Sequence, residues 1–357
     1  MTASGVRLDT SDEAILHGEA GPGAALAMWV LSGFAAIVGA RSLLPIQGSH
    51  IDGCLYHGQA SLDFIEAFRA SGTRVRVPTT LNVGSLDLIH PDLVRLPAAD
   101  AEPSRRLMEA HQALGCLPAF TCAPYQSLAR PRLGDQVAWG ESNAIVFANS
   151  VIGARTARYG DFIDLCCAIT GRAPAWSLHL DEHRLGRVVF RLSGFPASLV
   201  AGDELFVAVG LIVDAACDPH VPVIVGLPDP QGEDRLKALG AAAASSGSVA
   251  MFHAVGLTPE APDFATALGG REPLANIEVT QADVRAALAN LSSVPDGTPL
   301  TAVCLGTPHF SSAEWRSLTA ALAHAGPCRT PIYVNTARET LRQLEADPGF
   351  ARLVAKA

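Results

Sequence analysis

The sequence has very little lysine and few aromatic residues, and it lacks the short motifs that mark common nucleotide and hydrolase sites. Lysine occurs only at Lys237 and Lys356, and Phe, Trp and Tyr together make up 6% of the 357 residues. There is no G-x-S-x-G, no P-loop, no H-E-x-x-H and no convincing G-x-G-x-x-G after a strand, so serine hydrolase, nucleotide-binding and zinc-protease functions lose their usual support. The net charge of −9 and the absence of a basic tract argue against a nucleic-acid partner.

No Cys-x-x-Cys pair occurs among the eight cysteines, and acidic residues from Asp9 to Glu19 precede any apolar run. We therefore expect no secretion signal and a reducing cytoplasm, where the thiols are core residues or metal ligands. The one membrane-like run, Ala24 to Ala40, is shorter than the roughly 20 residues that a spanning helix needs. It is predicted to be a buried helix, with a membrane anchor as the alternative.

Strand-like and helix-like segments alternate along the chain, which predicts an α/β fold with mainly parallel sheets. In the first lobe, Leu43–Ile46 and Arg74–Pro78 read as strands, and Leu62–Arg69 and Arg105–Leu114 as helices. A high hydrophobic content of 49% with 17% charged residues is typical of a folded enzyme subunit.

A second α/β lobe is expected after a change of character near residue 198, so we predict lobes at approximately 1–197 and 198–357. Helices are expected from Ser311 to His324 and from Ala337 onward. A strand is predicted at Val188–Leu192, before this change. Strands predicted after it are Val221–Val225, Val249–Phe252, Leu300–Leu305 and Pro331–Val334.

The stretch from Gly134 to Pro174 combines an apolar helical pattern with polar side chains that a core helix would not carry. Buried polar groups must find partners or a ligand. We predict two helices, broken near Gly153 or Tyr159-Gly160, which form the floor of an active site for a small carboxylate.

Two parts of this stretch are candidates for binding the carboxylate. Ser142 and Asn143 could lie at a helix N-terminus, where backbone N–H groups attract an anion, and Arg155 or Arg158 could clamp it through two hydrogen bonds. The alternative is that the arginines form structural ion pairs with nearby aspartates, Asp161 or Asp164.

Other polar side chains follow predicted strands, where open α/β sheets place ligands. His50, His57 and Ser61 share a Gly-punctuated loop after Leu43–Ile46, and His309 follows the strand at Leu300–Leu305. Each histidine is either catalytic or the cap of a turn.

Two cysteines are candidate metal ligands. Cys122 lies in a loop of small and aromatic residues, and Cys304 stands at the end of a predicted strand. The alternative for each is a buried hydrophobic residue, which is also the expectation for Cys166 and Cys167.

Several segments, in this order, resemble the large subunit of aconitase X: HIDGCLYHGQASLDFIEAF, VPTTLNVGSLDL, the CAPYQ loop, WGESNAIVFANSVIGARTARYGDFIDLCCAITGRAP and LGTPHFSSAEW. The resemblance runs from about Asp12 to about Val354. It implies aconitase-like α/β/α lobes, an iron or iron–sulfur centre and a hydro-lyase reaction. Bacterial members include cis-3-hydroxy-L-proline dehydratases, archaeal members dehydrate mevalonate 5-phosphate, and the GTPHFSS loop resembles the bacterial type.

The resemblance also implies parts that this sequence does not contain. Family members have a final strand with an Asp-Thr-Cys element and a small swivel domain with a Gly-Arg-Gly-Ser loop. We therefore expect a separate small swivel subunit as partner. The centre would be a [2Fe-2S] cluster or mononuclear iron, with Cys122 matching the family's cysteine loop and Cys304 as a second candidate ligand.

The expected reaction is dehydration of cis-3-hydroxy-L-proline to Δ1-pyrroline-2-carboxylate, because a chain with two lysines and no basic loop suits a phosphate-free substrate. The alternatives are a mevalonate 5-phosphate type of dehydratase and a non-catalytic binding subunit. The expected catalytic residues are His50, His57, Ser61 and Glu141, and the expected substrate-binding residues are Asn82, Ser142, Asn143, Arg155 and Arg158.

Overall fold

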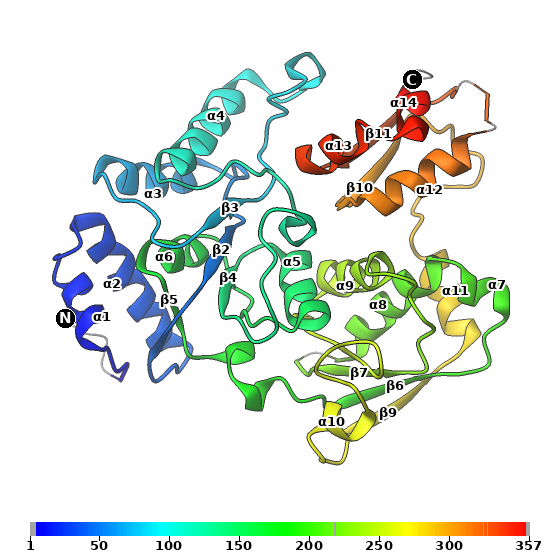
Figure 1. Ribbon diagram of the computed structural model, residues 1–357, viewed down its shortest axis with the longest axis horizontal. Coiled ribbons are helices and arrows are strands. Elements are labelled where there is room, and N and C mark those ends of the chain that lie inside the picture. Colours follow the sequence, from blue (N-terminus) through cyan, green and yellow to red (C-terminus); the bar gives the residue numbers. More distant parts are fainter. Residues whose placement is uncertain (1–4, 218, 324, 327, 355–357) are drawn as a thin grey trace. The chain divides into compact units, whose positions relative to one another are not determined.

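The computed structural model describes residues 5–217, 219–323, 325–326 and 328–354. The chain forms two compact units (Figure 1). The first contains the residues up to Pro124 together with Ala129–Ala148 and Gly153–Arg184, and the second contains Tyr125–Leu128, Asn149–Ile152 and the chain from Leu185 onward. Both units combine helices with mainly parallel strands, so the predicted α/β class is confirmed.

The first unit begins with two helices and then alternates strands with helices. Its helices are α1 (Thr10–Leu16), α2 (Pro22–Ile37), α3 (Gln59–Ala70), α4 (Ala98–Ala113), α5 (Ser142–Phe147) and α6 (Ile163–Thr170). Its strands are β1 (Leu43–Pro45), β2 (Gly48–Ile51), β3 (Thr79–Leu81), β4 (Val137–Trp139) and β5 (Arg172–Pro174). A π-helical turn, Ala148–Ile152, continues α5 and ends at Gly153 in the left-handed conformation, as predicted for one of the two break points.

A three-stranded parallel sheet in the order β3-β2-β4 forms the centre of the first unit. In the register of this sheet, His50 of β2 pairs with Thr80 on one side and with Trp139 on the other. Because the strands are parallel, their carboxyl ends meet at one edge, and the residues that follow them lie together there.

Of the two strands predicted in this unit, the one at Leu43 is confirmed, one residue shorter than expected, and the one at Arg74 was wrong. The segment at Leu43 does not lead into the site loop, because β1 pairs antiparallel with β5, and His50 lies inside the next strand. The segment Arg74–Pro78 is not a strand and lies just before β3. The backbone amides of Val75 and Arg76 instead donate to the carbonyls of Leu114 and Ala168, near the ends of α4 and α6.

Helices cover this sheet with apolar side chains. Helix α2 packs on α6, and α3 packs on α4 (Figure 1). The core includes Leu31, Ile51, Phe68 and Leu165, each at most 2% exposed, and burial of one such side chain contributes about 1.5–3 kcal/mol. The core thus holds the sheet rigidly beneath the edge where the polar loops emerge.

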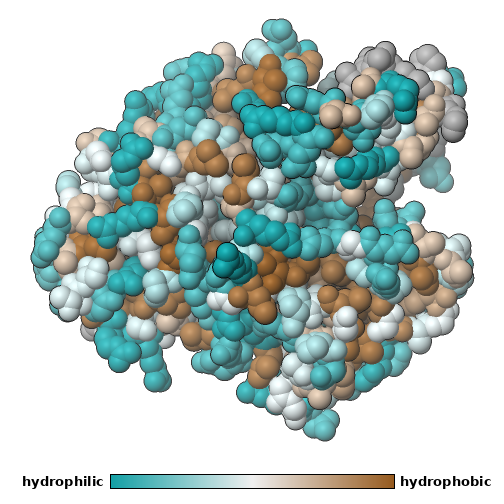
Figure 2. Space-filling model, viewed as in Figure 1, coloured by the Kyte–Doolittle hydropathy of each residue, from teal (hydrophilic) through white to brown (hydrophobic). Residues whose placement is uncertain are grey.

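The apolar run at Ala24 forms part of α2, a helix of 16 residues whose buried side chains belong to this core. In the described part of the chain, every helix is too short or too polar to cross a bilayer. Hydrophilic and hydrophobic residues are interspersed on the face shown in Figure 2.

The second unit contains two parallel sheets. Its helices are α7 (Ala197–Ala201), α8 (Glu204–Cys217), α9 (Asp234–Ser246), α10 (Phe264–Leu268), α11 (Gln281–Ala289), α12 (Ser312–Leu322), α13 (Arg338–Leu344) and α14 (Pro348–Val354). Strands β6 (Val188–Leu192), β7 (Pro222–Val225), β8 (His253–Ala254) and β9 (Ala275–Val279) form a sheet in the order β8-β7-β6-β9. Strands β10 (Val303–Phe310) and β11 (Ile332–Thr336) form the other.

Most predicted elements of the second unit are confirmed, with shifted ends, but Val249–Phe252 is not a strand, and β8 begins only at His253. Helix α12 begins one residue after the predicted start, because the Ser311 side chain caps it, and the predicted end, His324, lies outside the described residues. Strand β10 extends to Phe310, so His309 lies within a strand.

Helices α8 and α9 pack so closely that a Cβ on Gly210 would lie 2.4 Å from the carbonyl oxygen of Leu239.

Candidate functional site

Polar residues from three loops meet at the carboxyl edge of the β3-β2-β4 sheet. Asp52 directly follows β2, Asn82 directly follows β3, and Glu141 comes two residues after β4. The three strands are adjacent and parallel, so the loops that carry these side chains start side by side. The parallel topology predicted from the sequence therefore brings Asn82 and Glu141 to one place, together with Asp52.

Asp52 and Asn82 form a hydrogen-bonded pair. The side-chain amide of Asn82 donates to Oδ1 of Asp52. Burial raises the pKa of the Asp52 carboxyl above its usual range, and the charge of Asp161 adds to this effect, while the bond from Asn82 opposes it. Asn82 is 4% exposed, and its Oδ1 atom has no hydrogen-bond partner among the described residues. A buried polar atom of this kind is a natural contact for a ligand.

Glu141 caps α5 with its own side chain. Its carboxylate accepts hydrogen bonds from the backbone amides of Asn143 (3.1 Å) and Ala144 (2.6 Å), and the Ser142 hydroxyl lies 3.4 Å away. Burial raises the pKa of Glu141 to about 7, the two amide bonds oppose the rise, and the nearby charge of Asp52 adds to it. Of the two residues proposed for anion binding, Asn143 thus already donates its amide to Glu141, whose carboxyl group can hold or release a proton near neutral pH.

Three other candidates near this edge, His50, His57 and Ser61, differ in exposure. His50 is fully buried, with Nδ1 2.8 Å from Oγ1 of Thr80, and burial lowers its pKa to about 3. The expectation that His50 lies in a loop was wrong. His57 is exposed, and its charge acts on Asp52. The Ser61 hydroxyl donates to the carbonyl of Gly58 at 2.8 Å.

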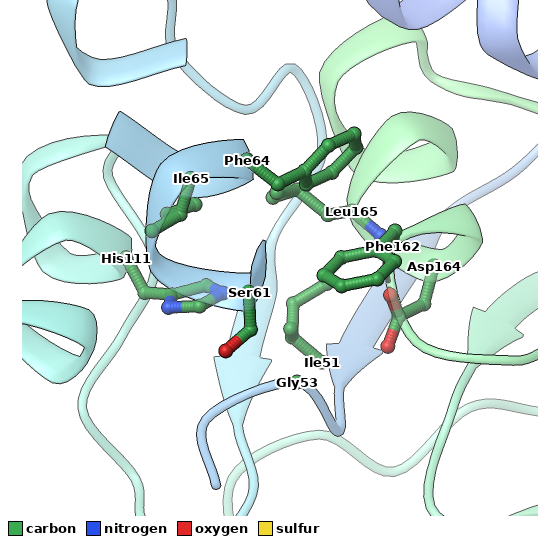
Figure 3. A pocket seen from close by; sticks show the side chains of 9 residues that line it. All are labelled: Ile51, Gly53, Ser61, Phe64, Ile65, His111, Phe162, Asp164 and Leu165. Atoms are coloured by element: carbon green, nitrogen blue, oxygen red, sulfur yellow. Dashed lines mark hydrogen bonds between the residues drawn. The ribbon is translucent and has the colours of Figure 1, made fainter. Parts of the chain in front are cut away.

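Ser61 also lines a small enclosed space (Figure 3). In that view, Ser61 and His111 lie on one side, Phe162 and Asp164 on the other, and Gly53 lies at the base. The cavity has a volume of about 10 Å³, which is about enough for one water molecule. It is too small for a substrate, and Gly53, the residue after Asp52, is part of its lining.

The two arginines occupy different positions along β4. Gln136 and Arg155 form an isolated parallel bridge, and the amide of Trp139 donates to the Thr156 hydroxyl at 3.1 Å. The segment 155–158 therefore runs parallel to β4 and beside it. Arg155 lies next to the amino end of β4, and Arg158 lies three residues closer to the carboxyl edge of the sheet. Arg155 pairs with the exposed Asp181, a different partner from the two aspartates that the sequence suggested.

The two candidate metal ligands lie in different units. Cys122 is buried in the first unit, and its carbonyl accepts a hydrogen bond from the Asn143 side chain. Cys304 is exposed on β10 in the second unit. Within the described residues, no three side chains of His, Cys, Asp or Glu are grouped as a metal site. The described donors therefore do not by themselves complete an iron site.

Sequence reasoning gave no site role to Asp164, which is fully buried in α6. Its Oδ2 accepts a 2.9 Å hydrogen bond from the amide of Asp52, and its Oδ1 accepts one of 2.7 Å from Leu165. Burial raises the pKa of this carboxyl to about 7. A lone acid amid the apolar run IDLCCAI was the signal that could have identified it.

Comparison with known proteins places the chain in a family. Residues 5–182 match the Aconitase X first domain, and residues 186–289 match the Aconitase X second domain. The phosphomevalonate dehydratase large subunit of Methanothermobacter thermautotrophicus is 35% identical over 90% of this chain and 78% of its own length. The chain belongs to the aconitase X family. The resemblance inferred from the sequence segments is thereby confirmed.

Other members of the aconitase X family extend the comparison. A cis-3-hydroxy-L-proline dehydratase of Pseudomonas aeruginosa is 45% identical over 99% of this chain, but the chain spans only 61% of that protein's length. The crystal structure of Thermococcus kodakaraensis aconitase X in its holo-form superposes with a TM-score of 0.88 at 30% identity. That match covers 98% of this chain and 86% of the other, so the fold of this aconitase X chain matches that of an experimentally determined member.

Proposed function

We propose that this chain is the catalytic large part of a hydro-lyase that dehydrates cis-3-hydroxy-L-proline to Δ1-pyrroline-2-carboxylate. The observation that carries the proposal is the meeting of Asp52, Asn82 and Glu141 at one sheet edge, with both carboxyl pKa values raised. Carboxyl groups tuned in this way suit proton transfer at neutral pH. The 45% identity to a Pseudomonas cis-3-hydroxy-L-proline dehydratase supports this substrate.

The proposed reaction is a β-elimination. A base removes the proton at Cα, the electron pair forms the Cα–Cβ double bond, and the hydroxyl group on Cβ leaves with one proton as water. The enamine product then moves a proton from nitrogen to Cβ and becomes Δ1-pyrroline-2-carboxylate. The site must therefore protonate a leaving hydroxyl while it holds the ring nitrogen and the carboxylate.

The side chains at the sheet edge divide these tasks. Glu141, with a pKa of about 7, carries the proton that the leaving hydroxyl takes. Asp52, oriented by Asn82, accepts a hydrogen bond from the substrate ammonium group. Arg158, the arginine toward the carboxyl edge, is assigned to the substrate carboxylate. The exposed His57, whose charge acts on Asp52, is a further candidate.

An iron or iron–sulfur centre is proposed as cofactor, with Cys122 as one ligand. The thiol lies in a buried loop whose carbonyl is held by Asn143 at the start of α5, and the family is related by name to aconitase. Cys304, the second candidate from the sequence, lies in the other unit and is not part of this proposal. Since the described residues do not complete a metal site, the remaining ligands would come from a partner polypeptide.

We further propose that a small swivel subunit completes the enzyme. Relatives of similar extent are named large subunits, which implies a smaller partner. The Pseudomonas dehydratase, in contrast, is longer than this chain, which spans 61% of it. The α-proton base, together with the missing metal ligands, is then expected on the swivel subunit.

The test reconstitutes the chain with a small aconitase X subunit and iron under reducing conditions. It offers cis-3-hydroxy-L-proline, its trans isomer and mevalonate 5-phosphate separately and measures product by mass spectrometry. Turnover of cis-3-hydroxy-L-proline is the expected result. Turnover of the phosphate ester alone would assign the chain to the other activity named among its relatives, and turnover of none would favour a binding subunit.

A further inference from the structure

Asp164 lies between two of the loops that build the candidate site. From α6, its carboxylate reaches across 112 positions of sequence to the amide of Asp52, at the end of β2, and accepts a 2.9 Å hydrogen bond. Its backbone is also anchored, since the Ser49 hydroxyl lies 3.2 Å from the Asp164 carbonyl and 2.7 Å from that of Ala138 in β4. Asp164 is therefore tied to β2 and β4, two of the three strands whose ends carry site residues.

The end of β4 is shaped around the same carboxylate. A Cβ added to Gly140 would lie 2.3 Å from Oδ2 of Asp164 and 3.0 Å from Cβ of Asp52. Real Cβ atoms essentially never lie 2.3 Å from an oxygen, so glycine is what lets the backbone before Glu141 approach the Asp164–Asp52 pair so closely. The positions of Asp52 and Glu141 are consequently linked through the space that Asp164 fills.

The Asp164 side chain is sealed from solvent, whereas Glu141 is only partly buried. The Phe162 ring and the small cavity lie beside Asp164 (Figure 3), and both of its carboxylate oxygens already accept backbone amides. A buried carboxylate in an apolar helix costs stability unless it is paired, and here its partners are backbone amides rather than a cation. The loss of stability has a reason if the hydrogen bond to Asp52 holds that residue in place for the site.

We propose that Asp164 is a positioning residue, which fixes the Asp52 loop against the end of β4 so that Asp52 and Glu141 face the substrate together. The inference rests on the proposed function, because the positioned groups are those assigned to the dehydration. Asp164 would thus affect the rate of turnover although it does not contact the reacting atoms, because a small displacement of a catalytic group lowers the rate strongly.

The first test is Asp164→Asn, which keeps the shape of the side chain but leaves one acceptor for two amides. In the reconstituted enzyme, kcat should fall by about 10- to 100-fold while KM changes little. Amide hydrogen exchange on the same protein should show the Asp52 amide exchanging at least about tenfold faster, with the amides of β6 in the other unit unchanged. A purely structural role would lower the thermal midpoint without this split between kcat and KM.

A matched glycine pair gives a second test. Gly140→Ala should reproduce both effects, because its Cβ displaces the Asp164 carboxylate. Gly160→Ala, where a new Cβ meets no atom within 4 Å among the described residues, should leave both unchanged. Unaltered Asp52 exchange in Asp164→Asn, or faster exchange with unchanged kcat, would overturn the inference. If the wild-type enzyme turns over none of the substrates, the proposed function fails, and the exchange data still decide whether Asp164 holds Asp52.

Discussion

The side-chain amide of Asn143 donates a 3.1 Å hydrogen bond to the carbonyl oxygen of Cys122. The backbone amide of the same asparagine donates to Glu141. One residue at the start of α5 thus links the loop of the proposed iron ligand to the carboxyl group proposed as proton donor. The cysteine loop and the sheet edge are therefore parts of one local structure in the first unit.

If Cys122 is an iron ligand, its replacement by serine should remove most of the bound iron and the visible charge-transfer absorption of the reconstituted enzyme. Serine keeps the size of the side chain but is a poor ligand for iron compared with a thiolate. Iron content by mass spectrometry and the visible spectrum measure the effect. Cys328→Ser, at an exposed cysteine outside the proposed site, is the control. Full iron retention in Cys122→Ser would refute the assignment.

Glu141→Gln should lower kcat by about 10²- to 10⁴-fold, since the amide cannot donate the proton that the leaving hydroxyl needs. In the wild-type enzyme, kcat should decline as pH rises through about 7, where Glu141 loses its proton. The variant's residual activity should lack this decline. A pH–rate profile from pH 5.5 to about 9 provides the measurement, and an unchanged alkaline limb in Glu141→Gln would assign the proton to another group.

Glu141 should also make stability depend on pH. Its pKa rises from 4.5 to about 7 on folding, so the folded state binds the proton more tightly. Its contribution is complete below about pH 4.5 and is lost as pH rises through 7. Urea unfolding at pH 5 and pH 8 should show that the wild-type free energy of unfolding falls by roughly 2 kcal/mol more than that of Glu141→Gln. Equal falls in both proteins would contradict the raised pKa.

The two arginines should respond differently to conservative substitution. Arg158→Lys should raise KM by about tenfold with an unchanged thermal midpoint, because lysine cannot form the two parallel bonds of a guanidinium with a carboxylate. Arg155→Lys should leave KM unchanged and cost at most about 1 kcal/mol, since its partner Asp181 is 83% exposed. The reverse pattern in steady-state kinetics and thermal unfolding would exchange the two roles.

In the second unit, Lys237 is 2% exposed and pairs with Glu314 and, at 3.1 Å, with Asp234. It also donates to the carbonyl of His309 at 3.3 Å, which ties β10 to α9. Lys237→Met should destabilise the protein by about 3–5 kcal/mol, because it leaves a partly buried carboxylate without its cation. Adding Glu314→Gln should recover part of this loss in chemical unfolding experiments. A loss below about 1 kcal/mol would show that the pair is dispensable.

The order and type of most elements could be predicted from the sequence, because they depend on local patterns. The apolar stripes of α3 and α12, the capping residues Asp9 and Ser311 and the β-branched run at β6 are all short-range signals. The family could be identified for the same reason, since its segments are contiguous in the chain. The sequence also determined which residue types are available, including Glu141, Asn82 and two arginines of the right chemistry.

Only the tertiary structure decided which of these residues act together. The register of β2 with β3 and β4 placed Asp52, Asn82 and Glu141 at one edge and buried His50 between the neighbouring strands. Burial, which no local pattern measures, raised the pKa of Glu141 and lowered that of His50. Asp164 acts on Asp52 across 112 positions, and a contact of that range exists only once the chain has folded.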